Sequence, residues 1–96
     1  MKISEPAADL GIIATVASSY KNVPIPQSTV VMGEVGLTGE VRRINLIEKR
    51  LKEAEKLGFK ACIIPENNKK VLKDNYKLDI IGVKSIGDML RILKIK

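Results

Sequence analysis

The chain has 96 residues, 45% of them hydrophobic and 29% charged, so it is long enough for one small domain and differs in composition from a disordered tail. It has no histidine and one cysteine, which excludes histidine catalysis, an internal disulfide, and a zinc site of imidazoles or paired thiolates. The net charge of +6 is uneven, because residues 1–41 carry two basic and four acidic side chains and residues 42–96 carry 15 basic and seven acidic ones. Such a basic half indicates either a polyanionic partner or a lysine-rich solvated surface.

A helix is predicted over about residues 6–19. Pro6 suits its first turn, because its missing N–H would have no partner there. The residues expected to form its apolar stripe are Leu10, Ile13, Val16 and Ala17. Small residues such as Gly11 and Ala14 would let another element approach this helix closely. Two prolines within residues 22–27 predict an extended loop after it.

A β-hairpin is predicted next. Residues 29–35 have the composition of a strand, in which Gly33 indicates a bulge or a close backbone approach. Residues 37–40 are expected to form the turn, and residues 41–44 a short returning strand.

The clearest helix covers residues 46–57, since apolar residues recur on one face and charged residues fill the remainder. The apolar face is expected to contain Ile47, Leu51, Ala54 and Leu57. Gly58 lies where a left-handed residue commonly ends a helix. Residues 59–65 form an apolar run typical of a strand buried on both faces, as in parallel sheets. Cys62 in this run is expected to be a small buried hydrophobic residue rather than a reactive thiol.

The remaining residues predict a polar stretch, a strand and a last helix. A short helix is expected over residues 68–74, and an apolar strand over residues 78–83. Ser85 and Asp88 resemble a capping box at the start of the last helix. Helices that alternate with buried strands predict an α/β layered fold with a partly parallel sheet. Because the predicted sheet is thin and the chain opens directly on a helix, we expect it to be part of a larger domain.

Four segments carry a family resemblance: residues 5–10 (EPAADL), 23–26 (VPIP), 33–42 (GEVGLTGEVR) and 51–60 (LKEAEKLGFK). They are similar to the C-terminal domain of the bacterial RadA/Sms DNA recombination proteins, which is similar in turn to the proteolytic domain of Lon proteases. The resemblance covers essentially all 96 residues. It implies a Lon protease-like α/β (α+β) fold of the ribosomal protein S5 domain 2-like type, with a mixed sheet packed with helices. The chain would then be a partial Lon-like domain, truncated at its N-terminus, from the C-terminal part of a longer protein.

Lon proteases use a serine–lysine dyad, and the resemblance implies that both of its positions are replaced here. Counting from the shared motifs, the serine position falls on Ala7 and the lysine position on Glu48. Alanine has no hydroxyl that could form an acyl-enzyme, and a carboxylate is not the neutral amine that deprotonates a serine. Lys49 lies about 100° further around the helix, so it would not face the same point. We therefore expect a non-catalytic scaffold; the alternative is a Lon-type peptidase that uses Ser4 and Lys49.

The resemblance further implies a role in DNA repair and homologous recombination in the bacterial cytoplasm. Whole RadA/Sms proteins carry a four-cysteine zinc finger and a RecA-like ATPase ahead of this domain, so zinc, ATP and magnesium are expected only in those upstream domains of a DNA-dependent ATPase. The family forms hexameric rings, which implies self-association, and a RecA-type recombinase is a candidate partner. No apolar run approaches the length of a membrane span and no secretory signal is recognisable, so no membrane partner is expected.

DNA contact would involve phosphates, because lysine and arginine bind charge without aromatic stacking. The expected DNA-binding residues are Arg42, Arg43, Lys49, Arg50, Lys52 and Lys56. Adjacent residues of a strand point to opposite faces, so only one of Arg42 and Arg43 can share a face with the helix. The alternative is an oligomerisation module that makes no contact with DNA.

Overall fold

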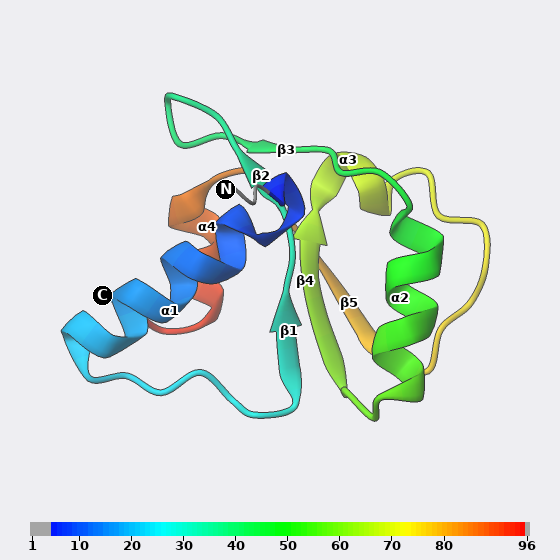
Figure 1. The fold of residues 1–96 in the computed structure, drawn as a ribbon, viewed down its shortest axis with the longest axis horizontal. Coiled ribbons are helices and arrows are strands. Elements are labelled where there is room, and N and C mark those ends of the chain that lie inside the picture. The colour runs from blue at the N-terminus through cyan, green and yellow to red at the C-terminus, as the bar shows by residue number, and fades with distance from the viewer. Residues whose placement is uncertain (1–4, 96) are drawn as a thin grey trace, which may run out of the picture.

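A parallel sheet of three strands lies at the centre of the molecule (Figure 1). The structure is a computed structural model that describes residues 5–95. The strands are β1 (Thr29–Val31), β4 (Ala61–Pro65) and β5 (Asp79–Val83), in the spatial order β1-β4-β5. Both neighbouring pairs are parallel, which confirms the arrangement that the apolar run of residues 59–65 predicted.

Side chains of the sheet alternate between its two faces, and helices cover each face. In β4, Cys62 belongs to one cluster of buried side chains and Ile63 to the other. Helix α2 (Ile47–Lys56) packs on the Cys62 side, whereas α1 (Asp9–Lys21) and α4 (Ile86–Ile92) pack on the Ile63 side. The described residues therefore form an α/β/α sandwich, which confirms the layered α/β class.

The N-terminal helix begins as a 3-10 turn, Pro6–Ala8, and continues as α1, with the proline in the first turn as predicted. The predicted apolar stripe is partly wrong, because Val16 is 63% exposed whereas Ala14 is fully buried. The physical reason is a close approach at Gly11, where an added Cβ would lie 2.9 Å from the carbonyl oxygen of Val31. Contact at Gly11 brings the backbone of α1 against β1, so Leu10 and Ala14 are buried while Ile12 and Val16 remain exposed.

The strand predicted over residues 29–35 is interrupted in the structure. The Gly33 N–H donates to the Ala7 carbonyl oxygen, and the Gly33 carbonyl oxygen accepts from the Leu10 N–H, both at 2.9 Å. These bonds confirm the close backbone approach predicted at Gly33. They also take the place of strand pairing, so the chain leaves the parallel sheet and continues as β2 (Glu34–Val35).

Strand β2 pairs with β3 (Val41–Arg42) in an antiparallel hairpin that projects from the sandwich (Figure 1). The predicted turn over residues 37–40 is confirmed, whereas β3 is shorter than the predicted residues 41–44. The hairpin is a two-stranded sheet of its own, so the expectation of one mixed sheet is wrong; the bonds to the glycine before β2 separate it from the parallel strands. It stays attached because the Val41 N–H donates to the Lys84 carbonyl oxygen (2.8 Å).

Helix α2 follows the amphipathic pattern predicted for residues 46–57 except at its ends. Three residues of the predicted apolar face are buried: Ile47, Leu51 and Ala54. Leu57 is 67% exposed instead, because the helix has ended and the chain turns through Gly58 in the left-handed conformation (φ +88°). At the other end, Leu46 also has a left-handed backbone (φ 58°) and is 62% exposed.

The polar stretch after β4 folds differently from the prediction. Helix α3 covers Glu66–Lys69 rather than residues 68–74. The helix starts directly after the proline that ends β4, and the buried Asn68 amide accepts the Ile44 N–H and donates to the Ile44 carbonyl oxygen, both at 2.9 Å. Residues 70–78 then run to β5 without a regular helix or strand.

Ser85 and Asp88 cap α4 in a modified form of the predicted capping box. The Ser85 hydroxyl accepts the Asp88 N–H (3.1 Å), as the motif requires. The Asp88 carboxylate accepts the N–H of Lys84 (2.9 Å), and it also bonds the Arg91 guanidinium (2.8 Å). Both contacts lower the pKa of Asp88, and the hydrogen bond from the Lys84 N–H has the larger effect.

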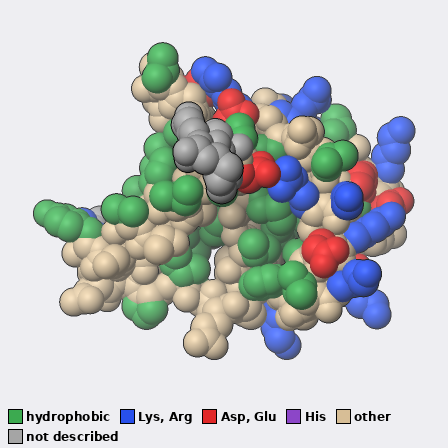
Figure 2. Space-filling view, in the orientation of Figure 1, with side chains coloured by type: hydrophobic (Ala, Val, Ile, Leu, Met, Phe, Trp, Pro, Cys, Tyr) green, Lys and Arg blue, Asp and Glu red, His purple; other side chains and the backbone are tan. Residues whose placement is uncertain are grey.

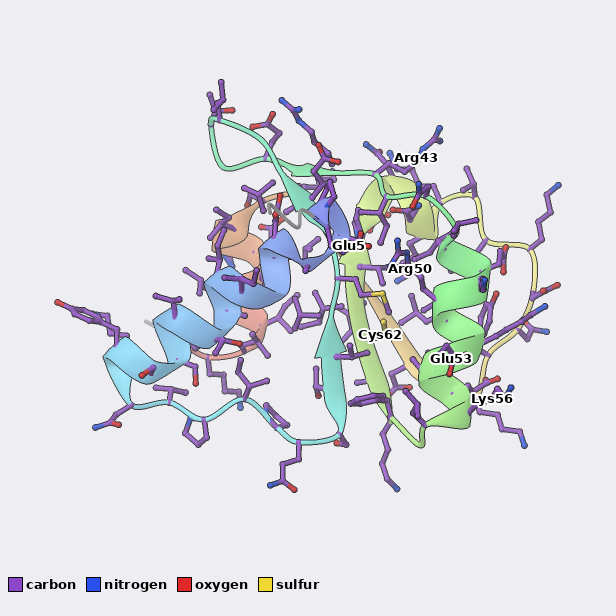
Figure 3. The ribbon with its side chains drawn as sticks, in the orientation of Figure 1. Glu5, Arg43, Arg50, Glu53, Lys56 and Cys62 are labelled. Atoms are coloured by element: carbon purple, nitrogen blue, oxygen red, sulfur yellow. The ribbon has the colours of Figure 1, made fainter. Side chains whose placement is uncertain are left out.

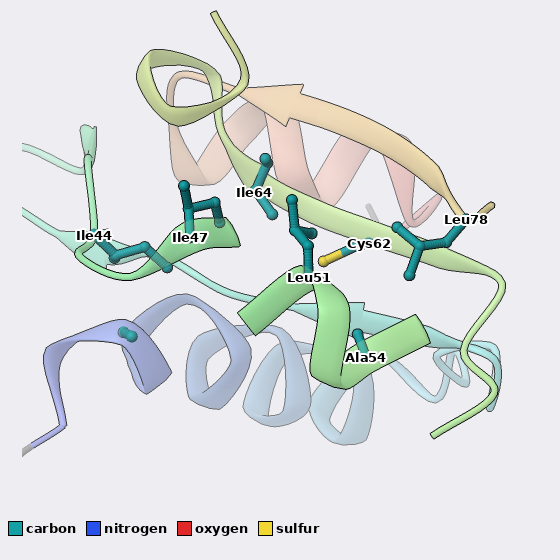
Figure 4. Close-up of a cluster of buried hydrophobic side chains, with 8 residues drawn as sticks. Ile44, Ile47, Leu51, Ala54, Cys62, Ile64 and Leu78 are labelled. Atoms are coloured by element: carbon teal, nitrogen blue, oxygen red, sulfur yellow. The ribbon is translucent and has the colours of Figure 1, made fainter. Parts of the chain in front are cut away.

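Cys62 lies at the centre of the cluster beneath α2. Val30, Cys62 and Ile80 lie opposite one another in the sheet register and belong to the same cluster. Figure 4 shows Leu51 of α2 facing the Cys62 side chain. Cys62 is fully buried, which raises the pKa of its thiol to about 12 and confirms that it is a buried hydrophobic residue. None of the described helices is both long enough and apolar enough to cross a membrane.

Candidate nucleic-acid interface

Ala7, which the resemblance places at the serine position, lies beside a small hollow. Ala7 is in the first helical turn, as predicted, and is only 5% exposed. The Glu5 carboxylate accepts its N–H (3.2 Å). The hollow has a volume of about 260 Å³, and its polar lining comes from Glu5, Glu34, Arg43 and Asn45. The described residues around it include no serine, threonine or lysine, so they supply neither member of a serine–lysine dyad.

Glu48, the residue expected at the lysine position, lies early in α2 as predicted. Its side chain is half-buried, and its carboxylate accepts a hydrogen bond from the Tyr76 hydroxyl. Tyr76 belongs to residues 70–78, so this carboxylate holds that segment against α2. The expected closeness of Ala7 and Glu48 stays a prediction.

The described part of the chain does not test the alternative pair, Ser4 and Lys49. Lys49 is exposed and borders a groove between α2 and β1. Ser4 lies outside the described residues. Lys49 and Glu48 therefore contact different surroundings, as their spacing on a helix predicted.

Residues 70–78 lie alongside α2 (Figure 1). Three contacts join the two: the Tyr76 hydroxyl with Glu48, the Lys77 N–H with the Glu55 carboxylate, and Lys52 Nζ with Asp74 (3.6 Å). A segment that is distant in the sequence is thereby held against the basic helix. Its lysines consequently join those of α2 on one side of the molecule.

We call the resulting group of exposed cations the basic surface. It consists of Arg43, Lys49, Lys52, Lys56, Lys69, Lys70, Lys73 and Lys77. Figure 2 shows lysine and arginine side chains gathered over α2 and its neighbours, while the half of this view that contains α1 is mostly apolar or uncharged. The uneven charge in the sequence is therefore also uneven in space, which favours contact with a polyanion on the α2 side.

Arg42 is engaged within the hairpin. Its guanidinium lies 3.1 Å from the Glu40 carboxylate and 3.9 Å from that of Glu34. Glu40 also accepts the hydroxyl (2.6 Å) and the N–H of Thr38. The Thr38 hydroxyl is the largest cause that lowers the pKa of Glu40 to about 2, with Arg42 contributing as well. This predicted DNA-binding residue thus stabilises a turn.

Arg50 holds the start of α2. Its Nε donates to the Asn45 carbonyl oxygen (2.9 Å) and its Nη2 to the Asn45 Oδ1 (3.2 Å), and Asn45 directly precedes the left-handed Leu46. The same group lies 3.5 Å from the Glu5 carboxylate, and its side chain is only 26% exposed (Figure 3). A half-buried arginine with these partners has a structural role.

Three of the predicted DNA-binding residues lie apart from these ion pairs: Arg43, Lys49 and Lys56. Among the described residues, no carboxylate lies within 4.0 Å of their charged groups. Figure 3 shows Arg43 ahead of α2 and Lys56 extending from the far end of that helix. The alternation predicted for Arg42 and Arg43 is not tested, because β3 ends at Arg42 and Arg43 lies outside the strand.

Comparison with known proteins places the chain in a family. Residues 2–68 match the family model described as subunit ChlI of Mg-chelatase. The chain belongs to this family. It is also 45% identical to the DNA repair protein RadA of Listeria monocytogenes over 95% of its own length and 20% of the relative. The corresponding figures are 46%, 95% and 20% for RadA of Bacillus subtilis, and 44%, 97% and 21% for RadA of Chlamydia pneumoniae.

These relatives confirm the resemblance to RadA proteins that the motifs predicted. The chain spans about a fifth of the length of the curated relatives it matches. The similarity extends over nearly the whole chain, so it includes both the dyad positions and the basic surface.

The structure adds cations that sequence reasoning missed: Lys69, Lys70, Lys73 and Lys77. The signal was present, because four lysines within nine residues form a charged run. Their position beside α2 could not be inferred, since it depends on the contacts made by Tyr76 and Asp74 and on the buried amide of Asn68. Asn68 itself carries no pattern that would distinguish it from a loop residue.

Proposed function

We propose that this chain is a non-catalytic, Lon-like scaffold domain of a RadA-type DNA repair protein and that its basic surface contacts DNA phosphates. The observation that carries the proposal is the basic surface itself, in which eight exposed cations from α2, its flanks and residues 69–77 gather on one side. The similarity to DNA repair proteins named RadA supports DNA as the polyanion.

The residues argue against peptidase activity. Ala7 has no hydroxyl, and Glu48 is bonded to Tyr76 rather than placed as a base. The one cysteine is buried, and its raised pKa of about 12 keeps it protonated at neutral pH. The described residues thus offer no activated nucleophile near the hollow.

The whole protein would be about five times longer than this chain. We place the chain in its C-terminal part, behind a zinc finger and a RecA-like ATPase that would hold zinc, ATP and magnesium. That protein would work in the bacterial cytoplasm as a hexameric ring with DNA and a RecA-type recombinase. The domain would support the assembly of the ring while its basic surface binds the DNA backbone.

Binding should depend on salt rather than on sequence. Lysine and arginine neutralise phosphates and release counterions, so each contact contributes about 0.9 to the slope of log K against log salt. Aromatic stacking contributes little, because only three residues of the chain are aromatic.

The test compares two triple variants that remove equal charge. Lys49→Gln, Lys56→Gln and Lys73→Gln remove cations of the basic surface, whereas Lys21→Gln, Lys84→Gln and Lys94→Gln remove exposed cations elsewhere. Fluorescence anisotropy of a labelled DNA duplex is measured over a salt series. The first variant should flatten the slope by up to about 2.7, for three lost contacts, and the second should leave it close to that of the original chain.

Equal slopes for both triple variants would mean that the basic surface is only solvated, and an oligomerisation module without DNA contact would then be the better description. Activity is tested separately by incubation with an unfolded protein substrate, with and without ATP. No cleavage is expected. Cleavage that persists through repurification and is lost in Lys49→Ala would contradict the non-catalytic proposal.

A further inference from the structure

Strand β1 lies at an edge of the sheet without the usual protection of edge strands. Its sequence over residues 29–31 is Thr-Val-Val, with no charge and no proline. The strand at the opposite edge, β5, begins with Asp79 and is flanked by Lys77 and Lys84. Charges and prolines protect exposed edges, because an open edge recruits other strands. The composition of β1 is therefore that of a strand that another segment covers.

An apolar groove lies on each side of this edge. The groove on the α1 side has a volume of about 600 Å³ and contains Ile12 and Val16. The groove on the α2 side has a volume of about 390 Å³ and contains Leu46 and Leu57. These four side chains are 59–67% exposed, and Figure 2 shows apolar side chains gathered between α1 and α2. Contiguous exposed apolar surface of this kind marks a binding site.

The backbone groups around β1 alternate between β4 and the open edge. The Ser28 carbonyl oxygen accepts from β4 (3.2 Å) and the Met32 N–H donates to β4 (2.9 Å). By alternation, Thr29, Val31 and Gly33 face the open edge. The groups of Gly33 are already bonded to the N-terminal helix.

Two of the remaining outward groups are not accessible. The Thr29 N–H donates to the Pro26 carbonyl oxygen (3.1 Å). The Val31 carbonyl oxygen packs against Gly11, where an added Cβ would approach it to 2.9 Å. Within the described residues, the Thr29 carbonyl oxygen and the Val31 N–H take part in no hydrogen bond.

This pair of groups determines the direction of a neighbouring strand. In a parallel pair, one residue of the neighbouring strand donates its N–H to the carbonyl oxygen of a residue on β1. The carbonyl oxygen of the same neighbouring residue accepts the N–H of the β1 residue two positions later. An antiparallel neighbour needs the N–H and the carbonyl oxygen of the same residue. Thr29 and Val31 satisfy only the parallel pattern. A second copy of β1 cannot be that parallel neighbour. The neighbour needs one residue whose N–H and carbonyl oxygen are both accessible, whereas in β1 the Thr29 N–H and the Val31 carbonyl oxygen are not.

We infer that the β1 edge receives an extended strand that runs parallel to β1 and is supplied by the part of a RadA-type protein that lies outside this chain. The inference rests on the proposed function, and the relatives have about four fifths of their length outside the matched region. Alternate side chains of the strand enter the two grooves, because successive residues of a strand point to opposite faces. Apolar residues at both sets of positions would cover Ile12, Val16, Leu46 and Leu57.

Amide hydrogen exchange tests the inference at single residues. Exchange is measured in this chain and in the full-length RadA of Bacillus subtilis, at the positions that align with Val30 and Val31. In this chain the Val31 amide should exchange at least about 100-fold faster than the Val30 amide, which faces β4. In the full-length relative the two positions should be protected to a similar extent.

Two proline substitutions in this chain form a matched pair. Val31→Pro removes an N–H that faces the open edge, where proline is tolerated, whereas Val30→Pro removes a bond to β4. The melting temperature should fall much less for Val31→Pro than for Val30→Pro. In the full-length relative, proline at the position of Val31 should instead increase exchange along the whole strand.

Two results would overturn the inference. Fast exchange at the Val31 position in the full-length relative would mean that no strand binds there. Protection of Val31 in this chain that grows with protein concentration would mean that a second copy covers the edge. Neither result depends on the DNA assay, because the amide exchange of Val30 and Val31 is measured without DNA and on chains that keep all cations of the basic surface.

Discussion

Helices α1 and α2 cover opposite faces of the same sheet by different physical means. Helix α1 buries Leu10 and Ala14 and also contacts β1 through its backbone at Gly11, so close approach adds to side-chain burial. Helix α2 keeps the charged residues outside and inserts Ile47 and Leu51, which are 8% and 0% exposed. An amphipathic pattern thus predicts the packing of α2, whereas the packing of α1 also depends on the positions of its small residues.

The difference extends to the surfaces that the helices present. The exposed side of α2 is charged and belongs to the basic surface, while that of α1 includes Ile12 and Val16, which border the groove along β1. The two proposals therefore assign different partners to the two surfaces: a polyanion to the α2 side and an apolar strand to the edge between the helices. Substitutions that separate the two packing modes therefore also test the two surfaces.

The largest effect is expected at Leu51, the fully buried anchor of α2. Leu51→Ala should lower the free energy of unfolding by about 2–5 kcal/mol, because it removes buried methyl groups and leaves a cavity. Leu57→Ala is the matched control, since it has the same side chain on the same predicted face but is 67% exposed. It should change stability by less than about 0.5 kcal/mol in urea unfolding. Similar losses for both would contradict the observed end of the helix.

Gly11 tests the packing of α1. Gly11→Ala should lower stability by about 1–2 kcal/mol, because the clash with the Val31 carbonyl oxygen outweighs the better helix propensity of alanine. Gly87 in α4 is the control: its added Cβ would have an ordinary contact of 3.6 Å with the Ser85 hydroxyl. Gly87→Ala should therefore cause no loss and a gain of up to about 1 kcal/mol. A gain at both glycines, measured by thermal unfolding, would show that α1 does not approach β1 so closely.

Arg50 separates a structural cation from a binding one on the same helix. Arg50→Lys keeps the charge but loses the two-pronged contact with Asn45, so stability should fall by about 1 kcal/mol. Lys49→Gln at the adjacent exposed position should change stability by less than about 0.5 kcal/mol. The DNA assay needs a variant that removes the charge: Arg50→Gln should leave the salt slope close to that of the original chain, whereas Lys49→Gln should flatten it by up to about 0.9. A flatter slope for Arg50→Gln would assign Arg50 to the interface.

The smallest effect on the free energy of unfolding near neutral pH is expected for Cys62, which lies beneath α2. Its pKa is raised to about 12 in the folded chain, against 9.0 for an exposed thiol. The unfolded state therefore loses this proton first, and stability should decline as pH rises from about 9 to 12, by up to about 1.4 kcal/mol per pH unit. Comparison with Cys62→Ala in urea unfolding at pH 8 and pH 11 isolates the contribution. An identical pH dependence in both proteins would contradict the burial of the thiol.

The candidate site divides into parts that the sequence predicted and parts that it did not. The expectation that Ala7 and Glu48 replace a serine–lysine dyad rests on residue identity at two motifs and stays a prediction, whereas the places of the two residues in helical turns are confirmed. The bond from Glu48 to Tyr76 could not be foreseen, because the contact joins residues 28 positions apart. For the same reason, Arg50 was expected to bind DNA, although its partners Asn45 and Glu5 give it a structural role.

The sequence by itself determined the order of the helices, the amphipathic helix α2 and the buried parallel strand β4. These features depend on periodicity, on composition and on single residue identities, which are local properties of the chain. Only the tertiary structure decided that Gly33 bonds the N-terminal helix and divides the predicted strand, and that residues 70–78 lie against α2. Both outcomes depend on hydrogen bonds between distant segments. The packing of the whole sandwich determines which acceptor each donor contacts, and the neighbouring residues in the sequence do not.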